Sequence, residues 1–391
     1  MDIKRMVESI NDELISIRRE FHKNPELSDK EYNTMERICR YLDSWGIEYR
    51  KGVAKTGVVA IVRGSQEGKT IGLRGDIDAL PVTEENDVEY KSINKGVMHA
   101  CGHDAHITIL LGAARIIKSM EKELKGNVKL FFQPAEETTG GADRMIKEGC
   151  LENPDVDAVL GLHVSPNIDT GTVQLRYGKM NASSDMITIV VRGKSAHGAN
   201  PEKSIDPLII SANIIMALQT IVSRNISPLD PAVFTIGSIH GGTKGNIIPE
   251  EVRMECILRT LDNGVRKYFK ERIISVVEGI SKSYGGEGEI IIQESYPPLI
   301  NSDEIVDSVK EVLEEVIGKE NIQLVPHAEL FAEDFAYFTQ AKKACFFNLG
   351  CRNEEKGCIY PLHNSRFNID EDCLGLGVEI QVRNVLKLLN S

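Results

Sequence analysis

The segment MHACGHDAH, residues 98–106, is dense in side chains that bind metals. Cys101, His103 and His106 stand close together, with Asp104 among them. Thiolate and imidazole groups both ligate divalent transition metals, and a C-x-H spacing on a turning backbone can aim both side chains at one point. The alternative is a buried cysteine followed by Asp104 as the cap of a helix. The segment therefore predicts either a metal site or an ordinary helix start.

Two adjacent acids, Glu136 and Glu137, follow an apolar run in NVKLFFQPAEETTGGA. Neighbouring side chains on an extended segment point in opposite directions, so one carboxylate can hold a metal while the other faces a water molecule. The alternative is a pair of surface acids that the dipole of the next helix favours. If the pair is functional, its two members have different tasks.

Two histidines also lie at the ends of apolar runs, His163 in AVLGLHVSP and His363 in the polar turn PLHNSRFNID. A lone histidine more often has a structural role, but here several possible metal ligands occur in one chain. They are Cys101, His103, Glu137, His163 and His363. Five donors exceed the three protein ligands of a single catalytic zinc and suit two metals that share a bridge. We therefore predict a dinuclear metal site.

The elements that must position these residues alternate along residues 1–178. Apolar runs predict strands at 57–63, 70–74, 127–132 and 157–164, and helical patterns occupy 29–45, 105–122 and 141–149. This alternation predicts an α/β domain with a mostly parallel mixed sheet flanked by helices. Open sheets of this kind bind ligands at the carboxyl ends of their strands, where the candidate donors stand.

A different order follows from residue 184. Strand patterns at 186–193, 232–239, 251–260 and 287–295 and helical patterns at 206–224 and 264–284 give the order β-α-β-β-α-β. This order predicts an inserted ferredoxin-like α+β domain. After it, helices at 302–317, 333–340 and 371–389 and a strand at 345–349 resume the first domain. The predicted divisions are residues 1–179 and 296–391 for the catalytic domain and 180–295 for a lid and dimerisation domain.

Composition excludes several classes of protein. The net charge is −12 over 391 residues, without a run of like charges, so a nucleic-acid or anionic-membrane surface has little electrostatic support. The most apolar stretch, 207–218, is too short for a membrane helix and predicts a core helix. The N-terminus lacks the apolar core of a secretory signal, and the eight cysteines form no CxxC pair. We expect a cytoplasmic protein with reduced thiols.

Nine motifs resemble, in their order, the aminoacylase/carboxypeptidase family of metal-dependent amidohydrolases, and most of all its hippurate hydrolase and indole-acetyl-amino-acid hydrolase branch. The motifs are RGDIDALP, MHACGHDAH, FFQPAEETTGGA, GLHV, SAHGANPEKSIDP, GGTKGNIIP, ILRTLD, AEDFAYF and LHNSRF. The resemblance implies that the five donors are metal ligands and that Glu136 is the general base. Imidazole, carboxylate and one thiolate suit Zn, Mn, Co or Ni, so the identity of the two divalent ions stays open.

The resemblance also implies roles outside the ligand set. Asp76 and Asp78 would orient ligands by hydrogen bonds, and His197 on the lid would stabilise charge during the reaction, in relatives across a dimer interface. Asn246 and Arg259 would hold the carboxylate of an N-acyl amino acid or small peptide substrate. The chain would form a homodimer or a higher homo-oligomer.

The sequence departs from the family pattern at a few positions, and two other functions stay open. Gly75 stands where relatives usually have Ala, AEDF replaces GSEDF, and Glu202 stands where many have His. A cysteine-nucleophile hydrolase would use Cys101 with His103 or His163, and a non-catalytic module would bind metal or ligand only. The further donors argue against the first alternative, and the intact donor set argues against the second. His22, His99, His106, His240 and His327 are assigned structural roles.

Overall fold

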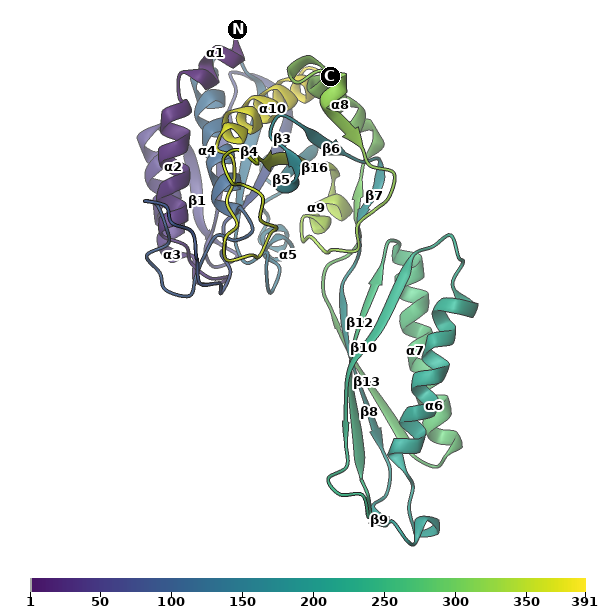
Figure 1. Ribbon diagram of the computed structural model, residues 1–391. Helices are drawn as coiled ribbons and strands as arrows, with labels where there is room; N and C mark the ends of the chain where they lie inside the picture. The colour runs from purple at the N-terminus through teal and green to yellow at the C-terminus, as the bar shows by residue number, and fades with distance from the viewer. Residues whose placement is uncertain (1) are drawn as a thin grey trace. The chain divides into compact units, whose positions relative to one another are not determined.

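The computed structural model describes residues 2–391, which divide into two compact units (Figure 1). The first unit runs to Gly178 and resumes at Ile300–His327 and Asp334–Ser391, and the second comprises Lys179–Leu299 and Ala328–Glu333. The predicted division places residues 328–333 in the first domain, whereas here they belong to the second compact unit. Backbone hydrogen bonds explain the difference, because Ala182 N–H donates to the carbonyl oxygens of Glu329 and Phe331 at 3.1 and 3.0 Å.

The first unit is built on one eight-stranded mixed sheet with the order β1-β2-β4-β3-β5-β16-β6-β15. Strands β4, β3, β5 and β16 run parallel to one another. Strand β1 pairs antiparallel with β2, β2 pairs antiparallel with β4, and β6 pairs antiparallel with β16. The carboxyl ends of the four central strands therefore lie at one edge. The strands are β1 (Glu48–Val53), β2 (Gly57–Arg63), β3 (Gln66–Asp76), β4 (Lys125–Gln133), β5 (Ala158–Asp169), β6 (Val173–Leu175), β15 (Ile322–Leu324) and β16 (Lys343–Arg352).

Helices cover both faces of this sheet, as alternation along the strands requires. Leu130 and Phe132 of β4 belong to the large core shared with α2, α4 and α10, while Phe131 between them stacks on Phe338 of α9 at 5.4 Å. The helices are α1 (Ile3–Glu8), α2 (Asn11–Lys23), α3 (Tyr32–Ser44), α4 (His103–Ser119), α5 (Gly141–Lys147), α8 (Asp303–Val316), α9 (Ala336–Ala341) and α10 (Asp372–Leu389), with a 3-10 turn at Lys319–Asn321. The predicted α/β fold with a mixed sheet flanked by helices is confirmed.

The chain leaves the first unit through β7 (Gly178–Asn181) and returns through β14 (Leu299–Asn301). Between them, the second unit has an antiparallel sheet of order β10-β12-β8-β13, and α6 and α7 pack on one of its faces (Figure 1). Its elements are β8 (Asp185–Arg192), β9 (Ala196–His197), α6 (Pro207–Thr220), β10 (Ala232–Gly241), β11 (Ile247–Ile248), β12 (Glu251–Thr260), α7 (Asn263–Ser283) and β13 (Glu287–Glu294), with short turns at Pro201–Lys203 and Ile221–Asn225. This is the ferredoxin-like β-α-β-β-α-β order.

Helix α6 differs from the core helix that its composition predicts. Ile210, Ile214 and Leu218 are buried against the sheet, but Ile209 and Met216 on the other face are 53% and 72% exposed. Together with the turn that follows, Pro207–Asn225 is the one described segment that could cross a membrane by length and composition. The exposed apolar residues leave this face of α6 available for another surface.

Candidate metal centre

The candidate donors gather at the carboxyl edge of the parallel strands, where β3 ends at Asp76 and β4 ends at Gln133. His103 is the first residue of α4, and Gly102 before it has φ +85°. A side chain at Gly102 would be strained by this φ, and its Cβ would lie 2.4 Å from Val164 Cγ2. Glycine at this position therefore lets the Cys101–His103 turn pack closely against Val164 of β5.

The donor atoms form two groups that share one thiol. The first group is Cys101, His103 and His163, and the second is Cys101, Glu137 and His363, each with its donor atoms within 4.8 Å of one another. Cys101 Sγ lies 3.4 Å from His163 Nε2, and His363 Nε2 lies 3.4 Å from Glu137 Oε1. The structure thus brings all five predicted donors together, and both groups contain the Cys101 thiol.

Hydrogen bonds on the outer side of the donors orient them inward. Asp78 accepts hydrogen bonds from His103 Nδ1 at 3.2 Å and from the backbone N–H of Glu137 at 3.1 Å. It therefore holds two of the candidate metal ligands, on two separate segments of the chain. His163 Nδ1 donates to the carbonyl oxygen of Val164 at 2.7 Å. In both histidines the bonded Nδ1 leaves Nε2 directed at the centre, which is the usual arrangement behind a metal ligand.

The centre has unsatisfied polar atoms that a cation would satisfy. Within residues 2–391, His103 Nε2 and Glu137 Oε1 are buried and make no hydrogen bond. Their separation is 3.8 Å, and Asp76 Oδ2 lies 3.7 Å from the same nitrogen. Buried orphan polar atoms are rare in proteins and call for a ligand. The donor set of sulfur, nitrogen and oxygen atoms therefore fits divalent transition metals.

Electrostatics support the same conclusion. Burial raises the pKa of the Cys101 thiol well above its usual value, and the charges of Glu137 and Glu136 raise it further. Burial alone would lower the pKa of His103, but Asp76, Asp78 and Glu137 outweigh it and raise the pKa to about 10. The protein surrounds this point with negative charge, which a bound cation would neutralise.

Glu136 and Glu137 diverge from one another after the turn at Ala135, which has the left-handed φ of +55°. Glu137 points to His103 and His363, whereas Glu136 Oε1 accepts from the backbone N–H of Asp334 at 3.4 Å. Glu136 is buried and still lies within 4.8 Å of the donor atoms of His103 and Glu137. The two adjacent carboxylates therefore occupy different positions at one centre.

A buried charge network that the sequence analysis missed supports the edge of the sheet. Arg74 Nη1 donates to Asp76 Oδ2 and its Nη2 to Asp334 Oδ1, both at 2.7 Å, and its Nε donates to Gln133 Oε1 at 2.8 Å. Asp76 thus contacts Arg74 as well as the histidines. The AEDFAYF motif contains Asp334 and the FFQPAEETTGGA motif contains Gln133, but neither motif indicates their shared contact with Arg74.

The remaining predicted residues lie in the second unit, and the structure does not bring all of them together. His197 pairs with Ile247 in the β9–β11 ribbon, beside Asn246, beyond the end of the sheet where β8 finishes. Arg259 lies at the other end of β12, eight residues from Glu251 and so about 26 Å away at ~3.3 Å per residue. Asn246 and Arg259 of one chain therefore do not lie together at one end of this sheet, and their substrate-binding roles stay predictions.

Arg259 nevertheless has a feature of an anion-binding group. Its Nη1 is buried and has no hydrogen-bond partner among the residues described. Burial lowers the pKa of its guanidinium. A buried guanidinium nitrogen without an acceptor would gain from a carboxylate, which arginine can bind through two parallel hydrogen bonds.

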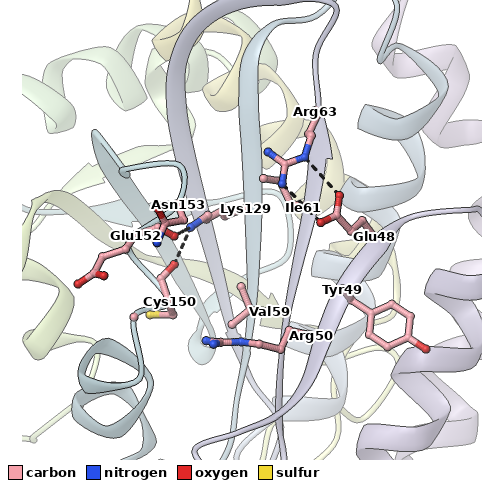
Figure 2. Close-up of a pocket in the computed structure, with 11 residues that line it drawn as sticks. Glu48, Tyr49, Arg50, Val59, Ile61, Arg63, Lys129, Cys150, Glu152 and Asn153 are labelled. Atoms are coloured by element: carbon pink, nitrogen blue, oxygen red, sulfur yellow. Dashed lines mark hydrogen bonds and ion pairs between the residues drawn. The ribbon is translucent and has the colours of Figure 1, made fainter.

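A separate cavity of about 180 Å³ lies over β1, β2 and β4 (Figure 2). Several of its charged groups already have partners, because Lys129 Nζ donates to the carbonyl oxygens of Cys150 and Glu152 and Arg63 pairs with Glu48 at 3.2 Å. The predicted site residues do not line this cavity. The chemistry of the first unit is therefore concentrated at the centre around Cys101.

Comparison with known proteins finds relatives over nearly the whole chain. The model of peptidase family M20/M25/M40 matches residues 72–387. Thermostable carboxypeptidase 2 of Saccharolobus solfataricus is 43% identical over 99% of this chain and 98% of its own length. N-acetyl-L-cysteine deacetylase of Bacillus subtilis is 39% identical over 98% of this chain and 90% of its own length. A Bacillus subtilis crystal structure described as a dinuclear metal binding peptidase superposes with a TM-score of 0.84, at 32% identity over 98% of this chain and 99% of that one.

Proposed function

The chain belongs to peptidase family M20/M25/M40 and is a metal-dependent amidohydrolase, and from this premise we propose that it cleaves the amide bond of N-acyl amino acids or small peptide-like amides. The names of two relatives, a carboxypeptidase and a deacetylase of an N-acetyl amino acid, support this substrate class. The observation that carries the proposal is the pair of donor groups that share Cys101.

Two divalent ions would occupy this centre. Cys101, His103 and His163 would hold one ion, and Cys101, Glu137 and His363 would hold the other. When bound, the ions would supply a water molecule of lowered pKa and polarise the amide carbonyl. Imidazole, carboxylate and one thiolate suit Zn, Mn, Co or Ni, so the chemistry of the donors leaves the identity of the metal among these four.

Glu136 is the general base of the proposed reaction. Its carboxylate is buried beside His103 and Glu137, within reach of a water molecule at the centre. It takes a proton from the attacking water and delivers it to the departing amine, which otherwise leaves poorly. Asp78 keeps His103 and the Glu137 turn in place during these transfers through its two hydrogen bonds.

Residues of the second unit would complete the active site, and they would come from two copies of the chain. His197 would donate a hydrogen bond to the oxygen that becomes negative during attack, with Asn246 beside it, and Arg259 would bind the carboxylate of the substrate. Because His197 and Arg259 lie at opposite ends of one sheet, a single substrate can meet both only if one comes from a second copy of the chain. The separation of His197 from Arg259 supports a homodimer in which the second unit is both lid and interface. The exposed face of α6, with Ile209 and Met216, offers apolar surface for it.

A cysteine-nucleophile mechanism is less consistent with the geometry. Catalytic cysteines need a lowered pKa, whereas burial and two carboxylates raise the pKa of Cys101. A thiol nucleophile also leaves Glu137, His363 and the orphan nitrogen of His103 without a task. All eight cysteines are buried and unpaired, which supports our proposal that the enzyme works in the reducing cytoplasm.

The test is an assay of metal-reconstituted protein against a panel of N-acetyl, N-benzoyl and dipeptide substrates, each with a free carboxylate, alongside the matching carboxamides. We expect hydrolysis of the free acids that a chelator abolishes and added metal restores. Hydrolysis that survives complete removal of metal, or equal hydrolysis of acids and carboxamides, would contradict the metal or the carboxylate part of the proposal respectively.

A further inference from the structure

One histidine of the dense motif, His106, lies at the centre but belongs to neither of the two proposed ligand groups. It is fully buried on α4, and its ring stacks on that of His103 one turn before it, with centroids 5.4 Å apart. Its ring also meets the edge of the His163 ring, with centroids 4.5 Å apart. The imidazole therefore lies between two of the proposed ligands.

Both ring nitrogens of His106 have partners on different strands. The backbone N–H of Val164 in β5 donates to Nε2 at 2.9 Å, so Nε2 carries no proton in this arrangement. The proton is then on Nδ1, which donates to Asp76 Oδ1 at the end of β3 at 2.5 Å. Hydrogen bonding alone defines one tautomer of this ring.

The sheet itself leaves a gap at this point. The β3–β5 ladder runs from Ile71–Ala158 to Arg74–Gly161 and ends there, two residues before Asp76 and three before Val164. Beyond the ladder, the His106 ring forms a hydrogen bond with each strand, through Asp76 of β3 and Val164 of β5. Gly75 allows this approach, because a Cβ at that position would lie 3.0 Å from the carbonyl oxygen of His106.

We propose that His106 is a positioning residue whose imidazole spans the gap between β3 and β5 and sets the place of His163 relative to His103. Val164 follows His163 directly and its carbonyl oxygen accepts from His163 Nδ1, so a shift of the Val164 backbone moves the His163 ring. We call the two hydrogen bonds of His106, to Asp76 and from Val164, the His106 bridge. Asp76, at one end of this bridge, faces His103 Nε2. The inference rests on the proposed function, since it assumes that His103 and His163 bind one ion.

The bridge touches only one of the two ligand groups. His103 and His163 belong to the group with Cys101, whereas Glu137 and His363 of the other group have no contact with His106 among the interactions of the described chain. Loss of the bridge should therefore weaken one metal site and spare the other. A residue that only stabilises the fold would weaken both.

Three substitutions separate the two ends of the bridge. His106→Asn keeps a donor near the position of Nδ1 and loses the acceptor for Val164, while His106→Gln keeps an acceptor near the position of Nε2 and loses the donor to Asp76. His106→Leu loses both. Thr108→Val is the matched control, because Thr108 is equally buried on α4 and its hydroxyl donates only to the carbonyl oxygen of Asp104.

The experiment titrates metal-free full-length protein with Co²⁺ and follows its absorption spectrum and the calorimetric binding curve, with thermal unfolding as the measure of folding. We expect two ions per chain in the wild type and in Thr108→Val. In His106→Leu and His106→Asn, one site should weaken by about 10- to 100-fold, the usual effect of removing a group that orients a ligand. His106→Gln should lose less, since it retains the contact that holds Val164.

The spectrum identifies the site that is lost. At limiting Co²⁺, the His106→Leu protein should give the spectrum of His163→Ala, which retains only the Cys101–Glu137–His363 group. Equal weakening of both sites, an unchanged pair of sites, or the same effect in Thr108→Val would each overturn the inference, and so would failure of all His106 variants to fold. A wild-type protein that binds fewer than two ions would instead contradict the proposed function on which the inference rests.

Discussion

The sharpest consequence of the centre concerns its adjacent acids, which should respond differently to the same substitution. Glu136→Gln preserves side-chain volume and an acceptor oxygen for the Asp334 N–H, whose 3.4 Å hydrogen bond is long and weak. The free energy of unfolding should therefore change by less than about 1 kcal/mol. Metal content should also persist, because Glu136 is outside both groups that contain Cys101.

Turnover should nevertheless fall in Glu136→Gln, because the amide cannot accept the proton of the attacking water. General acid–base catalysis contributes about 10²- to 10⁴-fold, which corresponds to roughly 3–5 kcal/mol in the barrier. Glu137→Gln should behave in another way. Its Oε1 lies 3.4 Å from His363 Nε2, and removing its charge should lower occupancy of that site and activity together, with partial rescue by excess metal.

The assay measures kcat and KM on one N-acyl amino acid and, on the same samples, metal per chain by elemental analysis. Near-normal kcat in Glu136→Gln at full metal occupancy would refute its role as the base. If Glu136→Gln lost metal while Glu137→Gln retained it, the two carboxylates would be assigned in reverse.

Three further predictions follow from other parts of the chain. Gly102→Ala should lower the free energy of unfolding by about 1–3 kcal/mol, measured with denaturant, because φ is +85° and the new Cβ would meet Val164. Metal occupancy should fall as well. Wild-type stability would contradict the close packing of this turn. His197→Ala and Arg259→Ala should each be nearly inactive with metal retained, and mixing the two after dissociation should restore part of the activity, whereas no recovery in confirmed mixed dimers would argue against a site shared between chains. Arg266→Met should destabilise the second unit by about 3–5 kcal/mol, measured by thermal unfolding. The reason is that Asp185 stays buried but loses its 2.7 and 2.8 Å hydrogen bonds to Arg266. A stability loss under about 1 kcal/mol would show that this ion pair contributes little.

The strands that consist of nearly continuous apolar sequence were predictable. Strand β2 has the predicted bounds, and β4 and β5 extend the predicted runs by a few residues, because central strands are nearly continuous apolar sequences. The first two helices were missed. In α2 the buried Leu14, Ile17 and Phe21 follow a helical spacing, but charged residues surround them and mask the apolar stripe.

The site was predictable as a set of donors, because strand ends converge at one edge of a parallel sheet. The roles that depend on distant contacts were not. His106 was assigned a structural role, and its contact with Val164 depends on α4 beginning at His103 and on β3 and β5 separating beyond Arg74. Likewise, the separation of Asn246 from Arg259 follows from the register of the second sheet, which residue types alone do not specify.

Counting metal per chain in matched variants tests most directly the proposal that the five donors would hold two ions, with Cys101 as a member of both donor groups. After reconstitution and removal of free metal, the wild type should retain two ions, His163→Ala and His363→Ala one each, and Cys101→Ala fewer than either single-site variant. Fewer than two ions in the wild type, or two ions retained in Cys101→Ala, would contradict a dinuclear centre bridged by Cys101.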